Sequence, residues 1–271
     1  MKTDAELLAQ RALWAGQHAL PIFFVLLALS LVATCASWWA LRRYTVPRRQ
    51  STMSATLVVG LRIAVGFVII VVGAGVFAAL AGQLDAGDGL SRADQALVDA
   101  LRTSVPRPAL QVFAALTHLG DTATLTGLCI GIAIALVALG RRWLALGWVA
   151  AVAGNGLLNH TLKQIFGRVR PLDPDGLMLE QGFSFPSGHS SGSVVAYGML
   201  AYVAVRLLPA RWHLPTLVTA VALAFTVGAS RMFLRVHFAS DVIAGFASGA
   251  AWLAVCVTSI ELTRRCRQRT G

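Results

Sequence analysis

The segment FPSGHSSGS, residues 185–193, places small polar groups and one histidine at the start of an apolar run. Gly188 lets a ligand approach the backbone closely, and a helix that begins here presents free N–H groups and the positive end of its dipole. Such a helix start binds anions. The imidazole of His189 beside it can donate a proton to a departing oxygen. The alternative interpretation is a Ser/Gly-rich helix start with an incidental interfacial histidine.

A second histidine, His237, lies four residues before Asp241 in the segment SRMFLRVHFASD. If this segment is helical, the two side chains share a face. The carboxylate then accepts the Nδ1 proton, leaves the Nε2 lone pair as a nucleophile and stabilises the imidazolium that forms. A metal half-site and a plain surface pair are the alternatives. Because few of the 12 acidic residues fall near these segments, we expect no metal and no other cofactor.

Five cationic side chains flank these two histidines. Lys163, Arg168 and Arg170 precede the first, and Arg231 and Arg235 precede the second. Together they predict a strongly positive pocket for a multiply charged anion, because arginine forks match the oxygens of phosphate. Taken singly, each is also compatible with a basic side chain that reaches from a span end to the membrane surface.

The scaffold that must position these groups is a membrane protein. Of 271 residues, 56% are hydrophobic and 13% charged, and the mean hydropathy is +0.69. The apolar runs lack the alternation of barrel strands, so the predicted fold class is all-α, a polytopic transmembrane helix bundle. A window of about 20 residues predicts spans at Leu20–Leu41, Leu57–Ala81, Thr122–Leu139, Trp143–Leu162, His189–Leu208, Pro215–Ala229 and Val242–Glu261.

Most of the basic residues gather at one set of span ends, which accounts for the net charge of +11 without a nucleic-acid partner. With these spans, twelve arginines fall on one side, in segments 42–49, 141–142, 206–211 and 264–269. The positive-inside rule assigns that side to the cytoplasm. The segments with His189 and His237 are therefore expected to face the periplasm or exterior of a bacterial-type cytoplasmic (inner) membrane.

Short surface helices are expected outside the spans. Thr3 and Glu6 have the spacing of a capping box, which favours a helix before the first span. Residues 91–116 show helical apolar spacing on both sides of a proline break, which predicts two short helices near the outer interface. The four cysteines have neither paired nor zinc-type spacing, so they indicate no disulfide framework and no zinc site.

Three segments together make the chain resemble the type 2 phosphatidic acid phosphatase family of membrane lipid phosphatases. The motif Lys-x6-Arg-Pro spans Lys163–Pro171, Pro-Ser-Gly-His spans Pro186–His189, and Ser-Arg-x5-His-x3-Asp spans Ser230–Asp241, in the order and spacing of the family. The resemblance covers about residues 51–261. It implies a six-helix phosphatase core within 51–271, preceded at 1–50 by a surface segment and one extra N-terminal span.

What the resemblance implies chemically is hydrolysis of a lipid phosphomonoester or diphosphate, without metal, through a phosphohistidine. It implies that His237 is the nucleophile, Asp241 its orienter and His189 the general acid. Arg168 and Arg235 lie outside the motif positions and are candidates for contacts with a second phosphate or a head group. The residues that it assigns to the phosphoryl oxygens are Lys163, Arg170, Ser187, Gly188 and Arg231.

Other functions stay open at this point. A lipid-phosphate phosphotransferase would use the same site, because only the second nucleophile differs. A transporter would place its charges nearer the midplane, and seven spans argue against a vanadium-dependent haloperoxidase, whose site looks similar. Undecaprenyl diphosphate is the favoured substrate, because recycling of a carrier lipid requires outward-facing dephosphorylation. Phosphatidic acid, phosphatidylglycerophosphate and a lipid A phosphate are alternatives, and the sequence predicts no oligomeric state.

Overall fold

A computed structural model describes residues 4–45, 55–84, 89–172, 177–178 and 180–270, and these residues form helices, turns and connections but no strand. Thr3 and the expected boundary at residues 50 and 51 lie outside the described ranges. Every predicted span coincides with a helix, so the all-α prediction is confirmed. The helices are α1 (Asp4–Gln17), α2 (Ala19–Thr45), α3 (Ala55–Ala81), α4 (Gly89–Ser104), α5 (Arg107–Thr117), η1 (His118–Gly120), α6 (Thr122–Ala138), α7 (Arg142–Phe166), α8 (Gly188–Leu207), η2 (Ala210–Trp212), α9 (His213–Phe233) and α10 (Ala239–Thr270).

Four helices of the described ranges are individually long and apolar enough to cross a membrane: α2, α3, α9 and α10. A fifth span results if α5 with η1 and α6, which are bent by 43° to each other, count as one. The other predicted spans, α7 and α8, are less apolar because they carry buried polar side chains such as Asn155, Asn159 and Ser191. These polar groups face the interior of the bundle, where the candidate site begins.

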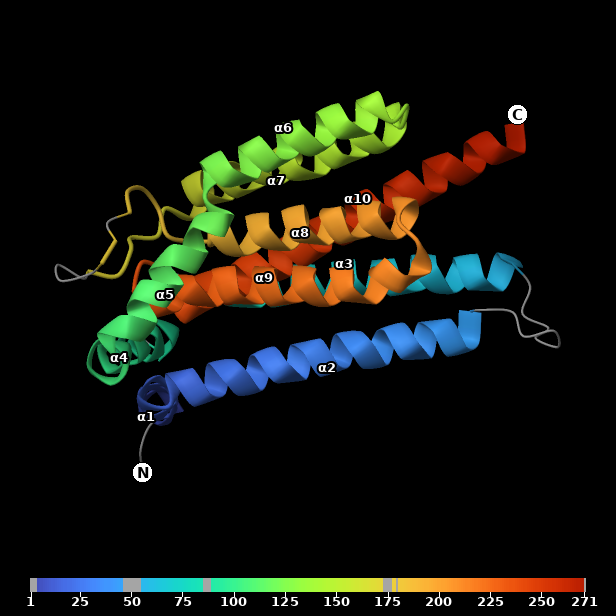
Figure 1. The fold of residues 1–271 in the computed structure, drawn as a ribbon. Helices are drawn as coiled ribbons and strands as arrows, with labels where there is room; N and C mark the ends of the chain where they lie inside the picture. The colour runs from blue at the N-terminus through green and yellow to red at the C-terminus, as the bar shows by residue number, and fades with distance from the viewer. Residues whose placement is uncertain (1–3, 46–54, 85–88, 173–176, 179, 271) are drawn as a thin grey trace.

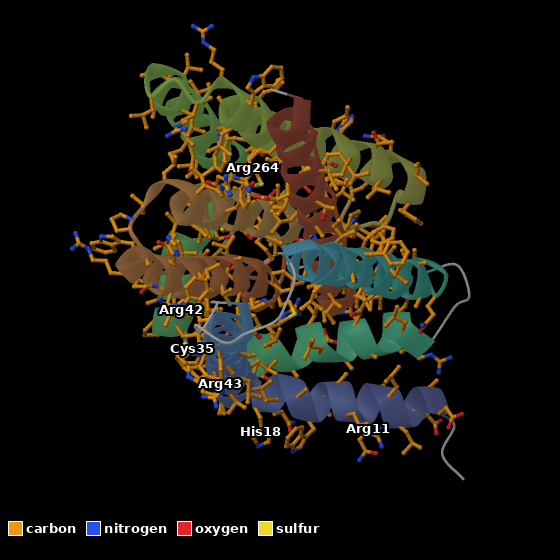
Figure 2. The ribbon with its side chains drawn as sticks, turned by 90° about the vertical axis from the view of Figure 1, so that its right-hand side faces the viewer. Arg11, His18, Cys35, Arg42, Arg43 and Arg264 are labelled. Carbon is orange, nitrogen blue, oxygen red and sulfur yellow. The ribbon has the colours of Figure 1, made fainter. Side chains whose placement is uncertain are left out.

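The long helices run roughly along one direction, with α6 and α7 on one side, α8, α9, α10 and α3 in the middle, and α2 on the other side (Figure 1). The predicted short helices α1, α4 and α5 gather at one end, together with the connection between α7 and α8. The opposite end carries Arg42, Arg43 and Arg264, as the view of that end in Figure 2 shows. The bundle therefore has an arginine end and an end covered by short helices.

Close contact between α8 and α10 aligns the two histidine segments. A Cβ atom on Gly245 of α10 would lie 2.6 Å from the main-chain oxygen of Ser187, and one on Gly249 would lie 2.8 Å from that of Ser191. Only glycine allows this approach at both positions. The first turns of α8 and α10 therefore lie against each other.

The N-terminal helix α2 packs on the bundle through Phe23. Its ring centroid lies 5.3 Å from that of Phe113 on α5 and 5.7 Å from that of Phe233 on α9. Phe23 is 7% exposed, whereas its neighbour Phe24 is 62% exposed and points away from the bundle. The aromatic cluster therefore fixes α2 to the helices that lead into the candidate site.

We expect Phe23→Ala to destabilise the protein by about 3 kcal/mol, because the truncation leaves a cavity in a packed aromatic cluster. Phe24→Ala is the matched control, and its effect should be small because the side chain is exposed. Thermal unfolding of both variants in one detergent measures the difference. Equal midpoints for the two variants would show that Phe23 does not hold α2 in place.

Candidate active site

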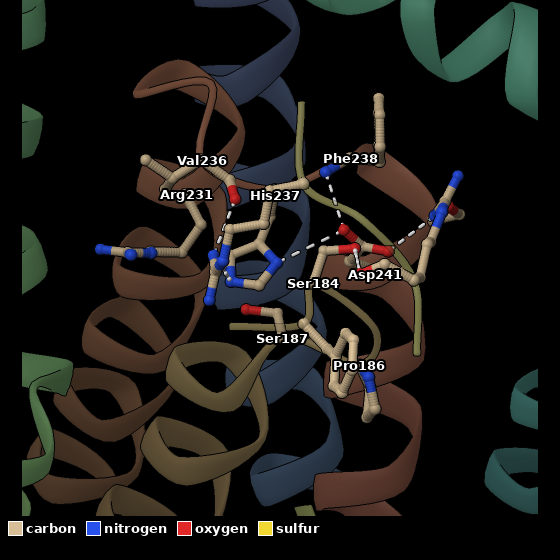
Figure 3. Close-up of polar contacts among 12 residues, drawn as sticks. Ser184, Pro186, Ser187, Arg231, Val236, His237, Phe238 and Asp241 are labelled. Atoms are coloured by element: carbon tan, nitrogen blue, oxygen red, sulfur yellow. Dashed lines mark hydrogen bonds and ion pairs between the residues drawn. The ribbon is translucent and has the colours of Figure 1, made fainter. Parts of the chain in front are cut away.

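The connection between α9 and α10 and the first turn of α10 bring His237 and Asp241 together (Figure 3). His237 Nδ1 lies 3.3 Å from Asp241 Oδ2, and both side chains are almost fully buried. The same carboxylate oxygen accepts a hydrogen bond of 2.9 Å from the backbone N–H of Phe238. The Phe238 N–H thus fixes the Asp241 carboxylate at the start of α10, and the carboxylate fixes the His237 imidazole.

Arg170 determines which nitrogen of His237 carries the proton. Its Nη1 lies 3.0 Å from His237 Nε2 and 2.9 Å from the carbonyl oxygen of Val236. A guanidinium only donates hydrogen bonds, so Nε2 must present its lone pair and the proton must reside on Nδ1, facing Asp241. In this tautomer, Nε2 has the free lone pair that a nucleophile needs. The Arg170 guanidinium lies next to Nε2, at the position that the group under attack would occupy.

The imidazole of His237 is neutral at ordinary pH. Burial lowers the pKa of His237 from 6.5 to about 3, although the hydrogen bond and the charge of Asp241 act in the opposite direction. The lone pair of Nε2 therefore stays available across the physiological range.

Glu180, in the connection between α7 and α8, contacts two of the arginines expected to bind phosphate. One carboxylate oxygen accepts a hydrogen bond from Arg231 Nη2, and the other lies 3.8 Å from Arg170 Nη2. Burial raises the pKa of Glu180, but the positive charges of Arg231 and Arg170 outweigh this effect and hold it below its ordinary value. An anionic group thus occupies the space between the two guanidinium groups.

Arg231 is completely buried at the end of α9. Its Nη1 donates a hydrogen bond of 2.8 Å to Thr117 Oγ1, while its Nε is buried without a hydrogen-bond partner among the described residues. Lys163, in the last turn of α7, donates a hydrogen bond of 2.5 Å from Nζ to the carbonyl oxygen of Phe183. The cations come from different helices and converge on one end of the bundle.

The Pro-Ser-Gly-His segment forms the start of α8. Ser187 is the N-cap, and its Oγ accepts a hydrogen bond of 3.4 Å from the backbone N–H of Ser190. Its own N–H donates to the main-chain oxygen of Asp241 at 3.0 Å. A Cβ on Gly188 would lie 3.0 Å from Asn159 Oδ1, so this position is closely packed. The helix start is thus tied directly to α10.

His189 is oriented by an acidic residue that the sequence did not reveal. His189 Nε2 donates a hydrogen bond of 2.9 Å to Asp121 Oδ1, and Asp121 Oδ2 accepts one of 2.7 Å from His118 Nδ1. A Cβ on Gly120 would lie 3.0 Å from the His189 ring, so the glycine lets η1 approach it. Each of the two site histidines therefore has its own carboxylate.

Arg168, expected near a second phosphate, contacts the far side of Asp241 instead. Its Nη1 donates hydrogen bonds of 2.6 Å to Asp241 Oδ1 and to Ser240 Oγ, and its Nη2 donates one of 2.8 Å to Asp94 Oδ2. The guanidinium also lies over the ring of Phe238, 4.3 Å from its centroid. With both terminal nitrogens engaged, this geometry favours a positioning role.

Arg235, the other candidate for a second phosphate, is 6% exposed and has a φ of 57° in the connection that leads to His237. Its expected contact with a second phosphate stays a prediction.

Four functional candidates were missed at the sequence level: Thr117, Asp121, Glu180 and Asp94. Asp94 lies on the buried face of α4 and is 3% exposed, close in helical spacing to the buried Val98 and Leu101. A carboxylate on an apolar helix face was the available signal for Asp94. Within the described residues, no group of three or more His, Cys, Asp or Glu side chains is placed to hold a metal ion.

Asp94→Asn should lower kcat about tenfold and change KM little, because it weakens the support of Arg168, and hence of Asp241, without touching the substrate. Asp99→Asn on the same helix is the control, since Asp99 is exposed and accepts a hydrogen bond only from Gln95 in the described contacts. Steady-state kinetics on both variants measures the split. Wild-type kcat for Asp94→Asn, or an equal loss in the control, would contradict this role.

Comparison with known proteins identifies the family. The model of the PAP2 superfamily matches residues 142–265, which contain all three motifs. Phosphatidylglycerophosphatase B of Bacillus subtilis (strain 168) is 34% identical over 161 residues, which cover 59% of this chain and 79% of that protein. The lipid A 1-phosphatase of Rhizobium johnstonii is 35% identical over 135 residues, covering 45% of this chain and 51% of that protein.

A solved structure agrees with this similarity. The crystal structure described as the first transmembrane PAP2 type phosphatidylglycerolphosphate phosphatase from Bacillus subtilis matches with a TM-score of 0.64 and 30% identity. The match covers 69% of this chain and 94% of that chain. With its helical bundle, its apolar spans and its three motif segments joined at one end, this chain belongs to the PAP2 superfamily and is a membrane lipid phosphatase of that type.

Proposed function

We propose that this enzyme hydrolyses a phosphomonoester or diphosphate of a membrane lipid through a phosphohistidine on His237, without a metal ion. The single observation that supports this most is the environment of His237. Asp241 lies behind Nδ1 at 3.3 Å, and Arg170 lies in front of Nε2 at 3.0 Å. The neutral imidazole of His237 and the cationic guanidinium of Arg170 are thus adjacent, so a phosphoryl group attacked by Nε2 would lie beside a positive charge.

In the first step, Nε2 of His237 attacks phosphorus and the bond from phosphorus to the leaving oxygen breaks. The leaving oxygen takes a proton from the imidazolium form of His189, which becomes neutral. The carboxylate of Asp241 stabilises the positive charge on the phosphorylated imidazole. Arg170 and Arg231 balance the charge on the phosphoryl oxygens. To do so, they release the carboxylate of Glu180 and bind the substrate phosphate in its place. The remaining contributors to phosphate binding are Lys163 and the helix start at Ser187 and Gly188.

In the second step, water attacks phosphorus, the phosphorus–nitrogen bond breaks, and His189 accepts the proton that water loses. The products are inorganic phosphate and the regenerated enzyme. A phosphotransferase would replace water with a lipid or sugar acceptor. Release of inorganic phosphate in equal amount to substrate consumed distinguishes hydrolysis from transfer.

For the substrate we favour undecaprenyl diphosphate, presented on the periplasmic or outer face of an inner membrane. The site lies at the end of the bundle opposite Arg42, Arg43 and Arg264, which supports an outward orientation by the positive-inside rule. The relatives named above act on phosphatidylglycerophosphate and lipid A, which are the competing candidates. A substrate panel on the purified enzyme tests the choice, and a higher kcat/KM on any of the monophosphates would overturn it.

We also propose that residues 51–271 form the phosphatase core and residues 1–50 an addition to it. The family match at residues 142–265 lies wholly within the proposed core, which supports this division.

His237→Ala should lower kcat by about 10⁴-fold or more, because no neighbouring group replaces its nitrogen. His189→Ala should depend on the leaving group. We expect a loss of about 100-fold on an alkyl phosphate and less than about tenfold on p-nitrophenyl phosphate, whose phenolate departs without a proton. Parallel kinetics on both substrates measure this ratio, and equal losses would remove His189 from the role of general acid.

A further inference from the structure

A groove of about 850 Å³ lies between α7 and α10 and is lined by residues at the arginine end of the bundle. Neither His237 nor Asp241 lines it. The ends of α7 and α10 that form it lie opposite the short helices in Figure 1. Its walls are mainly apolar and include Leu146, Trp252 and Val255. Arginines from three helix ends also line it: Arg141, Arg142, Arg206 and Arg264. The groove thus combines an apolar body with a basic rim.

The rim has more positive than negative charge. Glu261 lies 3.5 Å from Arg206 Nη1 and 3.0 Å from Arg264 Nη2, and it accepts a hydrogen bond of 2.7 Å from Tyr202. One carboxylate therefore meets two of the four arginines. The Nε of Arg264 is buried and has no hydrogen-bond partner within the described part of the chain. Glu261 meets Nη2 of Arg264 and not this Nε.

The apolar walls are fixed by packing. Trp252 of α10 lies so close to α7 that a Cβ on Gly154 would be 2.6 Å from its ring, and its Nε1 donates a hydrogen bond of 2.9 Å to the carbonyl oxygen of Ala151. Its polar atom is therefore satisfied within the protein, which leaves ring surface to line the groove. A Cβ on Gly147 would likewise lie 2.6 Å from Ile260.

We propose that this groove binds an anionic glycerophospholipid of the surrounding membrane, with the phosphodiester head group at the arginines and an acyl chain along Trp252 and Val255. Basic pockets between transmembrane helices on the cytoplasmic side are suited to anionic lipid head groups. A free phosphate compound would leave the apolar walls without a partner. The site is separate from the catalytic centre and does not depend on the proposed reaction.

The test is binding of phosphatidylserine to purified full-length protein by native mass spectrometry. Zwitterionic phosphatidylcholine, which has no net charge, is the comparison and should bind more weakly than phosphatidylserine. The variant R141Q/R142Q/R264Q removes three rim charges. The matched control is R42Q/R43Q/R211Q. Arg42 and Arg43 lie at the same end of the bundle (Figure 2), Arg211 lies in η2 directly after the α8 end that carries Arg206, and none of the three lines the groove. We expect the rim variant to bind phosphatidylserine about 100-fold more weakly and the control to bind it within twofold of wild type.

A second variant tests the apolar part. Ala150→Trp fills the groove from α7 and keeps every arginine, so it should reduce phosphatidylserine binding as well. Hydrolysis of p-nitrophenyl phosphate at the wild-type rate shows that each variant is folded. Equal loss in the rim variant and the arginine control, no loss in either, or competition by glycerol 3-phosphate as strong as by the lipid would overturn the proposal.

Discussion

The buried carboxylate of Asp241 is the interaction on which the site depends. It accepts hydrogen bonds from three directions, from the His237 ring, the Phe238 backbone and the Arg168 guanidinium. A buried carboxylate is costly unless it is paired and fully hydrogen-bonded. Arg168 supplies the opposite charge, and Asp94 and Ser240 hold Arg168 in turn. These contacts hold the His237 imidazole, the proposed nucleophile, in one orientation.

This network also explains why a short helix outside the spans matters for the chemistry. Asp94 belongs to α4, which lies at the same end as the motif segments, and its carboxylate reaches both Arg168 and the backbone N–H of Ser240 at the start of α10. The short helices therefore do more than cover the bundle. Through Asp94, α4 supports Arg168 and with it Asp241, which holds the proposed nucleophile His237.

The two ends of the bundle use arginine in different ways. At the catalytic end, Arg168, Arg170 and Arg231 are largely buried and each faces a carboxylate. At the other end the arginines flank apolar surface, as expected for side chains at the cytoplasmic surface of a membrane. The same residue type thus pairs with carboxylates at one end and flanks apolar surface at the other.

The sequence was sufficient where local spacing decides the structure. The helix start at Gly188 and the helices at the seven predicted spans follow from short-range pattern. The spacing of His237 and Asp241 also pairs them, but not on one helix face as expected, because His237 lies in the non-helical connection before α10. It was insufficient where tertiary contacts decide. Asp121, Glu180 and Asp94 reach the site from distant segments, and nothing in their neighbours indicates which arginine or histidine each one meets. Arg168 was a candidate for a second phosphate or head group because it lies beside the motif positions, whereas its partner Asp94 is 74 residues away in the chain.

The stereochemical course at phosphorus tests the central claim most directly. Each in-line displacement inverts the configuration, so a reaction through a phosphohistidine on His237 inverts twice. Hydrolysis of a phosphate ester made chiral at phosphorus with sulfur and oxygen isotopes, carried out in isotopically labelled water, should therefore yield product with net retention. Net inversion would mean that water attacks the substrate directly, and it would contradict the role of His237 as the nucleophile.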